Sequence, residues 1–293
     1  MGNVLVTGSA GFIGRHLVAA LQRDGYAVHA MGGEYDVTEE SSWNTFGTPD
    51  AVVHLAGRSS VRKGEADPLP AYRVNVVGTM KAMRFCSKTG ARLIFASTAS
   101  VYGTPHSLPV REDDSLQPQN AYACSKMMAE ATIKKCRVPS VIMRFANVYG
   151  PGQSKDFLIP TILEQLPTGR VVLDNPSSKR EYVFIDDVVN AIIAALRSTH
   201  AGVFNIGTGK STSVEELMTI LRKLYGQFSV SYANSYADGV QDIYFDSSSA
   251  QKFLGWHAET QLEEGLRKTL RSRGLLCEKS PTAPVQNYCS SAT

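Results

Sequence analysis

The chain has 293 residues, enough to bury a large hydrophobic core as one domain or as a large and a small one. Its formal net charge is only +3, and it contains neither a long basic run nor a membrane-length apolar run, so nucleic-acid-binding and membrane-spanning classes are not favoured. The 5 cysteines lack metal-ligand spacing and no leader segment is recognisable, so we expect reduced thiols, no metal site and a cytoplasmic location.

The N-terminal half alternates short apolar runs with amphipathic stretches, which predicts an α/β fold. Strands are predicted at residues 3–7, 26–30, 50–54, 92–96 and 140–145. Helices are predicted at residues 15–24 and 68–88, with a further helix starting near Asn120.

A glycine-rich loop separates the first predicted strand from the first helix. Gly8, Gly11 and Gly14 occupy this loop, directly after the strand 3–7. Glycines let the backbone approach a diphosphate, and the helix N-terminus offers free N–H groups and the positive end of its dipole. The strand–loop–helix context favours a dinucleotide site over a plain turn.

The second predicted strand ends without the acidic residue that commonly binds the adenosine ribose of NAD. The sequence there is Met31-Gly32-Gly33, and Glu34 follows two residues late. Loss of a carboxylate removes repulsion against a 2′-phosphate, so we expect NADP or NAD, leaning to NADP. Arg15 or Arg58 could contact that phosphate.

Tyr122 and Lys126 are four residues apart in a predicted helix and therefore share one face. A free tyrosine titrates near ~10, and a nearby ammonium is expected to lower the pKa of Tyr122 by favouring the phenolate. A tyrosine tuned in this way exchanges a proton with a sugar hydroxyl or ketone. The alternative is an exposed helix face without a catalytic role.

The glycine loop with Phe12 and Ile13, together with the Tyr122–Lys126 pair, resembles the extended branch of the short-chain dehydrogenase/reductase superfamily. This branch comprises the NAD-dependent epimerases, dehydratases and reductases of nucleotide sugars. The resemblance covers about residues 3–271. It implies a Rossmann-type doubly wound parallel sheet in residues 1–150, to which later segments return, a smaller α/β substrate lobe in 151–272 and a flexible tail in 273–293. It also implies a homodimer through the helices that carry Asn75 and Tyr122, by analogy alone.

The same resemblance assigns the cofactor contacts. Asp36 and Val37 would contact adenine, the residues after the third strand would lie under the riboses, and Lys126 would bind the nicotinamide ribose. Two interpretations of Asn75 stand equally: a contact with the cofactor, or a polar residue on a helix face. His54 is expected to be a core histidine. The implied cofactor residues are Gly8, Gly11, Phe12, Ile13, Gly14, Asp36, Val37, Leu55, Ala56, Gly57, Asn75, Tyr122 and Lys126.

The resemblance also implies that Thr98 completes the catalytic set with Tyr122 and Lys126. Its hydroxyl would position the reacting oxygen, although a Ser/Thr turn that caps the strand end is an alternative. Dehydratases of this branch carry Asp-Glu directly after this threonine, whereas Ala99-Ser100 follows here. Loss of water is therefore not expected.

Three residues of the C-terminal half are implied to bind substrate. Asn147 would lie near the sugar–diphosphate linkage, Leu158 opens a predicted helix 157–166 beside the nucleotide, and Arg180 would bind the diphosphate. A salt bridge from Arg180 to Glu181 or Asp187 is the alternative. Asp186 is expected to cap the next helix, and Trp256 to be buried. A second diphosphate arginine, frequent in the family, is missing from the segment 235–238.

These features predict an enzyme that reduces a nucleotide-linked 4-keto(-6-deoxy) sugar, with hydride from NAD(P)H and a proton from Tyr122. The short segment after Glu34 and the sequence Gly150-Pro151-Gly152-Gln153 resemble those of the 4-keto sugar nucleotide reductases, although related epimerases share much of the second. A 4-epimerase with tightly bound NAD would use the same residues. A non-catalytic dinucleotide-sensing protein is a third possibility, against which the intact Thr98, Tyr122 and Lys126 argue.

Overall fold

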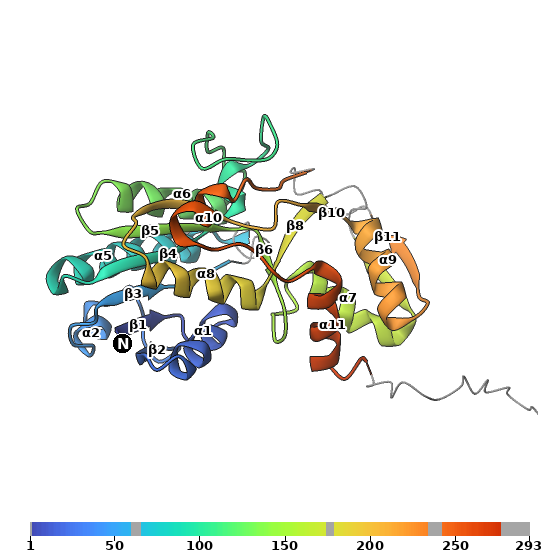
Figure 1. Ribbon diagram of the computed structural model, residues 1–293, viewed down its shortest axis with the longest axis horizontal. Coiled ribbons are helices and arrows are strands. Elements are labelled where there is room, and N and C mark those ends of the chain that lie inside the picture. The colour runs from blue at the N-terminus through green and yellow to red at the C-terminus, as the bar shows by residue number, and fades with distance from the viewer. Residues whose placement is uncertain (1, 60–65, 174–178, 234–241, 277–293) are drawn as a thin grey trace, which may run out of the picture.

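The computed structural model describes residues 2–59, 66–173, 179–233 and 242–276. Its centre is a parallel sheet of six strands in the order β2-β1-β3-β4-β5-β9 (Figure 1). These strands are β1 (Asn3–Thr7), β2 (Ala27–Met31), β3 (Ala51–His54), β4 (Arg92–Thr98), β5 (Ser140–Phe145) and β9 (Gly202–Ile206). Strand β9 comes from the C-terminal half, so a later segment returns to the sheet.

Helices cover both faces of this sheet. The helical segments of this part are α1 (Phe12–Arg23), α2 (Glu40–Asn44), α4 (Leu69–Tyr72), η1 (Arg73–Val77), α5 (Gly78–Thr89), η2 (Ala99–Tyr102), α6 (Ala121–Lys134), α8 (Ile185–Arg197) and α10 (Ser248–Leu254). Helices α1 and α8 contact each other on one face, and α4, α5 and α6 form the other. The predicted doubly wound α/β fold is confirmed.

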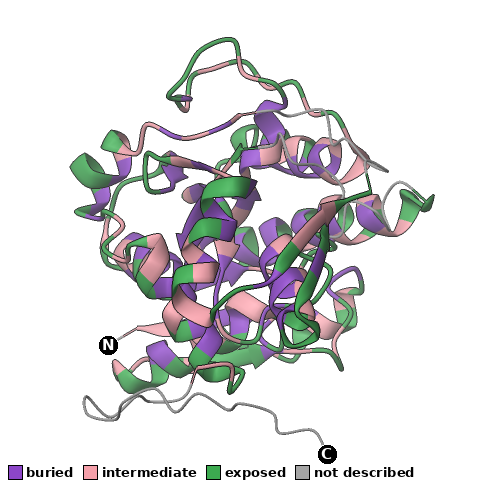
Figure 2. Cartoon of the chain, turned by 90° about the vertical axis from the view of Figure 1, so that its right-hand side faces the viewer, coloured by how far each residue is buried: buried purple, intermediate pink, exposed green. Residues whose placement is uncertain are grey.

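The central strands are buried on both faces, as parallel strands between two helical layers require. Val4 and Val6 of β1 pack into a core with Leu17 of α1, whereas Leu5 points to a second core with Phe85 of α5. Figure 2 shows the buried residues gathered along these strands and on the helix faces turned toward them. In a sheet of this kind, ligands bind in the loops at the carboxyl ends of the strands.

A smaller group of elements lies beside the sheet, at the right of Figure 1. It contains the sheet β10-β8-β6, the parallel pair β11-β7, and helices that pack on them. The elements are β6 (Asn147–Tyr149), α7 (Leu158–Gln165), η3 (Leu166–Thr168), β7 (Arg170–Leu173), β8 (Lys179–Phe184), β10 (Ser211–Ser213), α9 (Val214–Tyr225), β11 (Ser229–Tyr232) and α11 (Leu262–Ser272). The domain limits 1–150, 151–272 and 273–293 stay predictions, and most of the predicted tail lies outside the described residues.

Two local predictions change. The helix predicted at 68–88 is interrupted by the π-helical turn η1, which contains Asn75. Asp186 is not a cap: α8 begins at Ile185 after Phe184, which places Asp186 in the first turn, where its charge still suits the helix dipole. Trp256 is buried as expected. Within the described residues, no helix combines the length and the apolar character needed to cross a bilayer.

Candidate active site

Strand β4 and helix α6 bring Thr98, Tyr122 and Lys126 together at the carboxyl edge of the sheet. Helix α6 starts at a fixed point, because Asn120 Oδ1 accepts a hydrogen bond from the Ala123 amide at 2.9 Å. Thr98 is the last residue of β4, and its side chain lies close enough to the Tyr122 hydroxyl to favour the ionised form of the phenol. Lys126 is buried, and its Nζ donates to the Ala96 carbonyl of β4 at 2.8 Å.

The predicted effect of Lys126 on Tyr122 is wrong in this structure. Burial raises the pKa of Tyr122 to about 12, and only the Thr98 hydrogen bond acts in the opposite direction. Burial also lowers the pKa of Lys126 to about 8, against the opposing influence of Glu130. The phenol is therefore neutral at physiological pH, because desolvation outweighs the effect of Thr98.

Thr98 caps the turn at the end of β4, which is one of the two roles considered for it. Its Oγ1 accepts a hydrogen bond from the Ser100 amide at 3.2 Å and lies 3.3 Å from the Ser100 hydroxyl, which caps the turn η2. The same side chain reaches Tyr122. The cap therefore fixes the orientation of the hydroxyl that meets the phenol.

The glycine loop passes so close to its neighbours that side chains would not fit. Gly8 has φ of +66°, and a Cβ atom there would lie 2.7 Å from the Ala56 amide nitrogen. A Cβ atom on Gly14 would overlap the Gly8 carbonyl oxygen. Gly11 precedes α1, whose N-terminus no side chain of the described residues caps. Phe12 and Ile13 begin this helix, so its free N–H groups and the tight loop fit a dinucleotide diphosphate.

Asn75 links the loop after β3 to helix α6. It is completely buried, its Oδ1 accepts from the Arg58 amide at 2.8 Å, and its Nδ2 donates to the Ser125 hydroxyl at 2.8 Å. A Cβ atom on Gly57, in the same loop, would lie 3.3 Å from Lys126 Nζ. The loop 55–57 therefore borders the Tyr122–Lys126 helix, and Asn75 is a buried link rather than a residue of an exposed helix face.

The end of β2 does carry a carboxylate. The Glu34 side chain folds back over Gly32. If Gly32 carried a Cβ atom, that atom would lie 3.1 Å from Glu34 Oε2. Ser9 Oγ of the glycine loop lies 3.4 Å from the same point. Arg15, one of the two arginines considered for a 2′-phosphate, donates instead to the Gly152 carbonyl. This carboxylate weakens the sequence argument for NADP, which rested on a strand end without an acidic side chain.

The turn after Glu34 positions the two residues predicted to meet adenine. Asp36 Oδ1 accepts from the Thr38 amide at 2.9 Å and from its hydroxyl at 2.8 Å, and these bonds hold the pKa of Asp36 below its usual range. Arg73 lies 3.3 Å from Asp36 Oδ2. Val37 is buried against Gly78 of α5. Asp36 remains exposed enough to contact a ligand, whereas Val37 offers mainly its backbone.

The three predicted substrate residues lie on or next to the smaller lobe. Asn147 is exposed on β6, and its Nδ2 donates to the Glu181 carbonyl at 3.1 Å. Leu158 is half-buried at the start of α7, and Arg180 is half-buried on β8, where its Nη1 donates to the Lys179 carbonyl at 2.8 Å. The segment without the second arginine lies within residues 234–241, outside the described residues.

Glu181 and Asp187, the two carboxylates considered as partners of Arg180, accept hydrogen bonds from backbone amides. Glu181 is 1% exposed and accepts from the amides of Gly209 at 2.5 Å and Phe245 at 3.0 Å. Asp187 accepts from the Thr260 amide at 3.1 Å. Burial raises the pKa of Glu181 to about 7, although these amides favour the ionised form.

His54 is a core residue, as predicted. Its side chain is completely buried beside Phe95, and Nδ1 lies 2.8 Å from the Thr7 hydroxyl. Nε2 has no hydrogen-bond partner among the described residues. Burial lowers the pKa of His54 to about 3, so the ring stays neutral.

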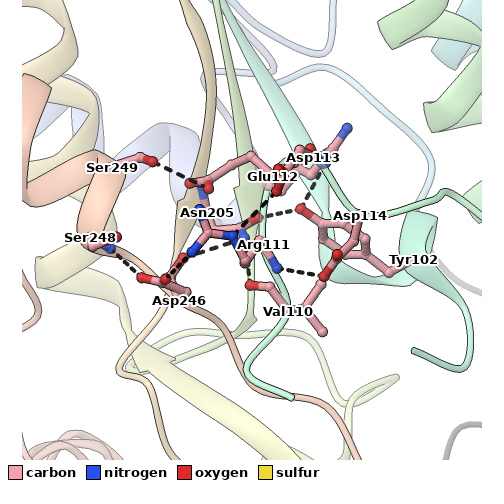
Figure 3. A network of polar contacts seen from close by, with 11 residues as sticks. Tyr102, Val110, Arg111, Glu112, Asp113, Asp114, Asn205, Asp246, Ser248 and Ser249 are labelled. Carbon is pink, nitrogen blue, oxygen red and sulfur yellow. Dashed lines mark hydrogen bonds and ion pairs between the residues drawn. The ribbon is translucent and has the colours of Figure 1, made fainter. Parts of the chain in front are cut away.

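The loop between η2 and α6 is tied to β9 by a polar network (Figure 3). Glu112 accepts from the Asn205 amide at 2.9 Å and from the Ser249 hydroxyl at 3.3 Å. Arg111 lies 3.3 Å from Asp246 Oδ2. This network anchors the chain immediately before the helix that carries Tyr122.

Sequence reasoning missed a buried ion pair beneath the site. Glu130 of α6 and Arg144 of β5 are each 1% exposed and lie 2.7 Å apart. The spacing of Glu130, four residues after Lys126, could have indicated that it shares the helix face of Tyr122 and Lys126.

The sequence model of the NAD dependent epimerase/dehydratase family matches residues 4–207. The chain belongs to this family. A UDP-glucose 4-epimerase of Mycolicibacterium smegmatis is 31% identical over 305 residues, covering 91% of this chain and 96% of that protein. The protein is therefore an enzyme of the extended short-chain dehydrogenase/reductase type, and an NAD or NADP cofactor is confirmed at the level of the family.

Solved structures of epimerase/dehydratase-type proteins share this fold. The UDP-glucose 4-epimerase of Thermotoga maritima, solved with UDP-glucose, has a TM-score of 0.86 and 28% identity, covering 93% of this chain and 98% of that one. RMD of Pseudomonas aeruginosa, solved with NADPH, has a TM-score of 0.86 and 25% identity, with the same coverage of 93% and 98%. Nucleotide-sugar chemistry is thus established for the family, whereas the individual reaction is not.

Proposed function

We propose that this enzyme transfers hydride at C4 of a nucleotide-linked sugar. The observation that carries the proposal is that Thr98 and the Tyr122 hydroxyl come together beside Lys126, and that residues 55–57 border both Lys126 and Gly8 of the glycine loop. When bound, the dinucleotide supplies or removes the hydride. The proposed cofactor contacts are the glycine loop with Phe12 and Ile13, Asp36, Val37, Leu55, Ala56, Gly57, Asn75, Tyr122 and Lys126.

The side chains divide the proton chemistry between them. In the reductive step the neutral Tyr122 phenol donates its proton to the C4 ketone oxygen and becomes a phenolate. In the oxidative step, which comes first in an epimerase, the phenolate form takes the proton of the C4 hydroxyl and becomes the neutral phenol again. Thr98 holds that oxygen through its hydroxyl. Lys126 supplies the positive charge that stabilises the oxyanion and the phenolate when they form.

The sugar nucleotide would extend from this site toward the smaller lobe. We assign Asn147, Leu158 and Arg180 to the substrate, with the Arg180 guanidinium on the diphosphate. A planar guanidinium matches two phosphate oxygens at once, which suits a half-buried position on β8.

The reaction supported best is 4-epimerisation. Glu34 at the end of β2 favours NAD, and a cofactor that regains its hydride in each turnover suits an epimerase. The relative at 31% identity is also a UDP-glucose 4-epimerase. Ala99-Ser100 supplies no carboxylate after Thr98, which argues against dehydration.

Reduction of a 4-keto(-6-deoxy) sugar nucleotide is the second candidate. It is supported by the short segment between Glu34 and Thr38 and by the turn Gly150–Gln153, which packs against α1 through Arg15 and through His16, 3.0 Å from the Pro151 carbonyl. This reaction uses the same Thr98, Tyr122 and Lys126 in one direction only.

One experiment separates the two reactions. The purified enzyme is incubated with UDP-glucose and NAD, or with a dTDP- or GDP-linked 4-keto-6-deoxy sugar and NADH or NADPH, and products are identified by NMR. Formation of UDP-galactose without net cofactor reduction supports the epimerase. Loss of NADH or NADPH equal to the ketone consumed supports the reductase. Binding of neither dinucleotide would contradict both.

We also propose a homodimer through α4, α5 and α6. These contacting helices expose large apolar side chains, with Leu69 74% exposed, Met80 52% and Met128 46%. Apolar side chains gathered on one face are typical of an interface between subunits. Light scattering should give a dimer for the native protein and a monomer for Met80→Glu combined with Met128→Glu.

A further inference from the structure

Helix α6 carries a buried carboxylate below the proposed site. Tyr122, Lys126 and Glu130 follow one another at intervals of four residues, so they lie along one face of the helix. Glu130 is 1% exposed, and burial of a carboxylate at such a position requires strong partners.

Those partners come from the two strands that end at the site. Glu130 Oε1 accepts from Ser97 Oγ at 2.5 Å and from Arg144 Nε at 3.0 Å. Glu130 Oε2 accepts from Arg144 Nη2 at 2.7 Å, which makes the contact bidentate. Ser97 and Arg144 are register partners on β4 and β5, and Ser97 immediately precedes Thr98. The carboxylate therefore joins α6 to both strands within one residue of Thr98.

Arg144 is also held on its other side. Its Nη1 donates to the Tyr102 hydroxyl at 2.7 Å and to the Glu112 carbonyl at 3.0 Å. The Tyr102 hydroxyl donates to Asn205 Oδ1 at 2.7 Å, within the network of Figure 3. The guanidinium is thus fixed from the strand side and from the loop that precedes α6, and it leaves Glu130 little freedom.

We propose that Glu130 is a positioning residue of the hydride-transfer site. Its contacts fix the position of α6 along β4, so that Tyr122 lies next to Thr98. Its negative charge favours the protonated form of Lys126. The inference rests on the roles proposed for these three residues. A buried ion pair is seldom needed for stability alone, because well-packed apolar residues of similar volume are often as stabilising.

The charges around Lys126 agree with this role. The titratable groups around it are Tyr122 and Glu130 on α6 and His54 on β3. Two further cations pair with Glu130 on its other side, Arg144 of β5 and Lys134 of α6, the latter 3.7 Å from Oε2. Tyr122 and His54 are neutral, because their pKa values are about 12 and about 3. Burial lowers the pKa of Lys126, and the negative charge of Glu130 raises it. Removal of the carboxylate must therefore lower this pKa further.

The test measures the ionisation of Lys126 directly, without substrate or cofactor. Protein labelled with ¹⁵N-lysine is titrated by NMR, and the Lys126 signal is assigned by its loss in Lys126→Arg. In Glu130→Gln the midpoint should fall by about one pH unit, the usual effect of losing one nearby opposite charge. Glu215→Gln, an exposed glutamate in the first turn of α9, is the matched control and should leave the midpoint unchanged.

An unchanged Lys126 midpoint in a folded Glu130→Gln protein would overturn the proposal and leave the ion pair a structural contact. If this variant does not fold, Glu130→Met combined with Arg144→Met removes both charges; because Arg144 lies behind Glu130, the Lys126 midpoint should still fall, but by less. A shifted midpoint in an enzyme that turns over no sugar nucleotide would contradict the proposed function but not the role of Glu130 toward Lys126.

Discussion

The Glu34 carboxylate lies against Gly32 at the end of β2, with Oε2 3.1 Å from the position that a Cβ atom would take on this glycine. The chain thus returns a negative charge, two residues late, to the strand end beside the glycine loop. Such a charge accepts hydrogen bonds from ribose hydroxyls and repels a 2′-phosphate.

This contact predicts that the enzyme binds NADH more tightly than NADPH. Glu34→Gln keeps the size of the side chain but removes its charge, so the ratio of the two dissociation constants should move about tenfold toward NADPH. Fluorescence titration with each cofactor measures the ratio, and Glu215→Gln is the control. An unaltered ratio in Glu34→Gln would show that this carboxylate does not face the ribose.

Tyr122→Phe should abolish proton transfer while the fold persists. We expect turnover to fall by about a hundred- to ten-thousand-fold, the range usual for a positioned acid or base. Thr98→Ala should also slow turnover, whereas Thr98→Ser keeps the hydroxyl and much of the rate. Tyr225→Phe, at the end of α9, is the control. Full turnover by Tyr122→Phe would remove this tyrosine from the mechanism.

Two glycine substitutions compare the tight glycine loop at Gly14 with the open turn at Gly33. A Cβ atom on Gly14 would overlap the Gly8 carbonyl, whereas a Cβ atom on Gly33 would meet nothing within 4 Å. Gly14→Ala should cost about 1–3 kcal/mol of unfolding free energy and most of the NADH affinity. Gly33→Ala should stay within about 0.5 kcal/mol of the native protein. Urea unfolding and NADH fluorescence measure both, and equal effects of the two variants would refute the tight loop.

His54 predicts how stability depends on pH. Its pKa is lowered from 6.5 to about 3 by burial, so its stabilising contribution is complete above pH 6.5 and is lost as the pH falls toward 3. Between pH 7.5 and 5 this single group should remove about 2 kcal/mol from the unfolding free energy.

The variant His54→Asn should be less stable at pH 7.5 but should lose less stability on acidification, because it no longer titrates. His106→Asn, in an exposed loop, should keep the slope of the native protein. Urea unfolding at both pH values gives the slopes. A native slope in His54→Asn would mean that the buried ring does not resist protonation.

Local patterns in the sequence were enough to predict several parts of the site. The strand 3–7, the three glycines and the helix that follows form a short continuous segment, whose backbone geometry depends on neighbouring residues. The face shared by Tyr122 and Lys126 follows from helical periodicity, and Asn120 was recognisable as the start of that helix. The family resemblance then placed Thr98 beside Tyr122.

Contacts between distant segments decided the rest. The pKa of Tyr122 rises because the folded chain excludes water from the phenol, and no spacing along the sequence measures that desolvation. Glu130 and Arg144 pair only because α6 packs on β4, the strand that pairs with β5, and Asn75 reaches Ser125 only because η1 packs against α6. Helical periodicity and local backbone geometry were enough to predict which side chains would carry the chemistry, since both depend on neighbouring residues. Only the tertiary structure decided their charge states and supports, since burial and ion pairing depend on segments brought together by folding.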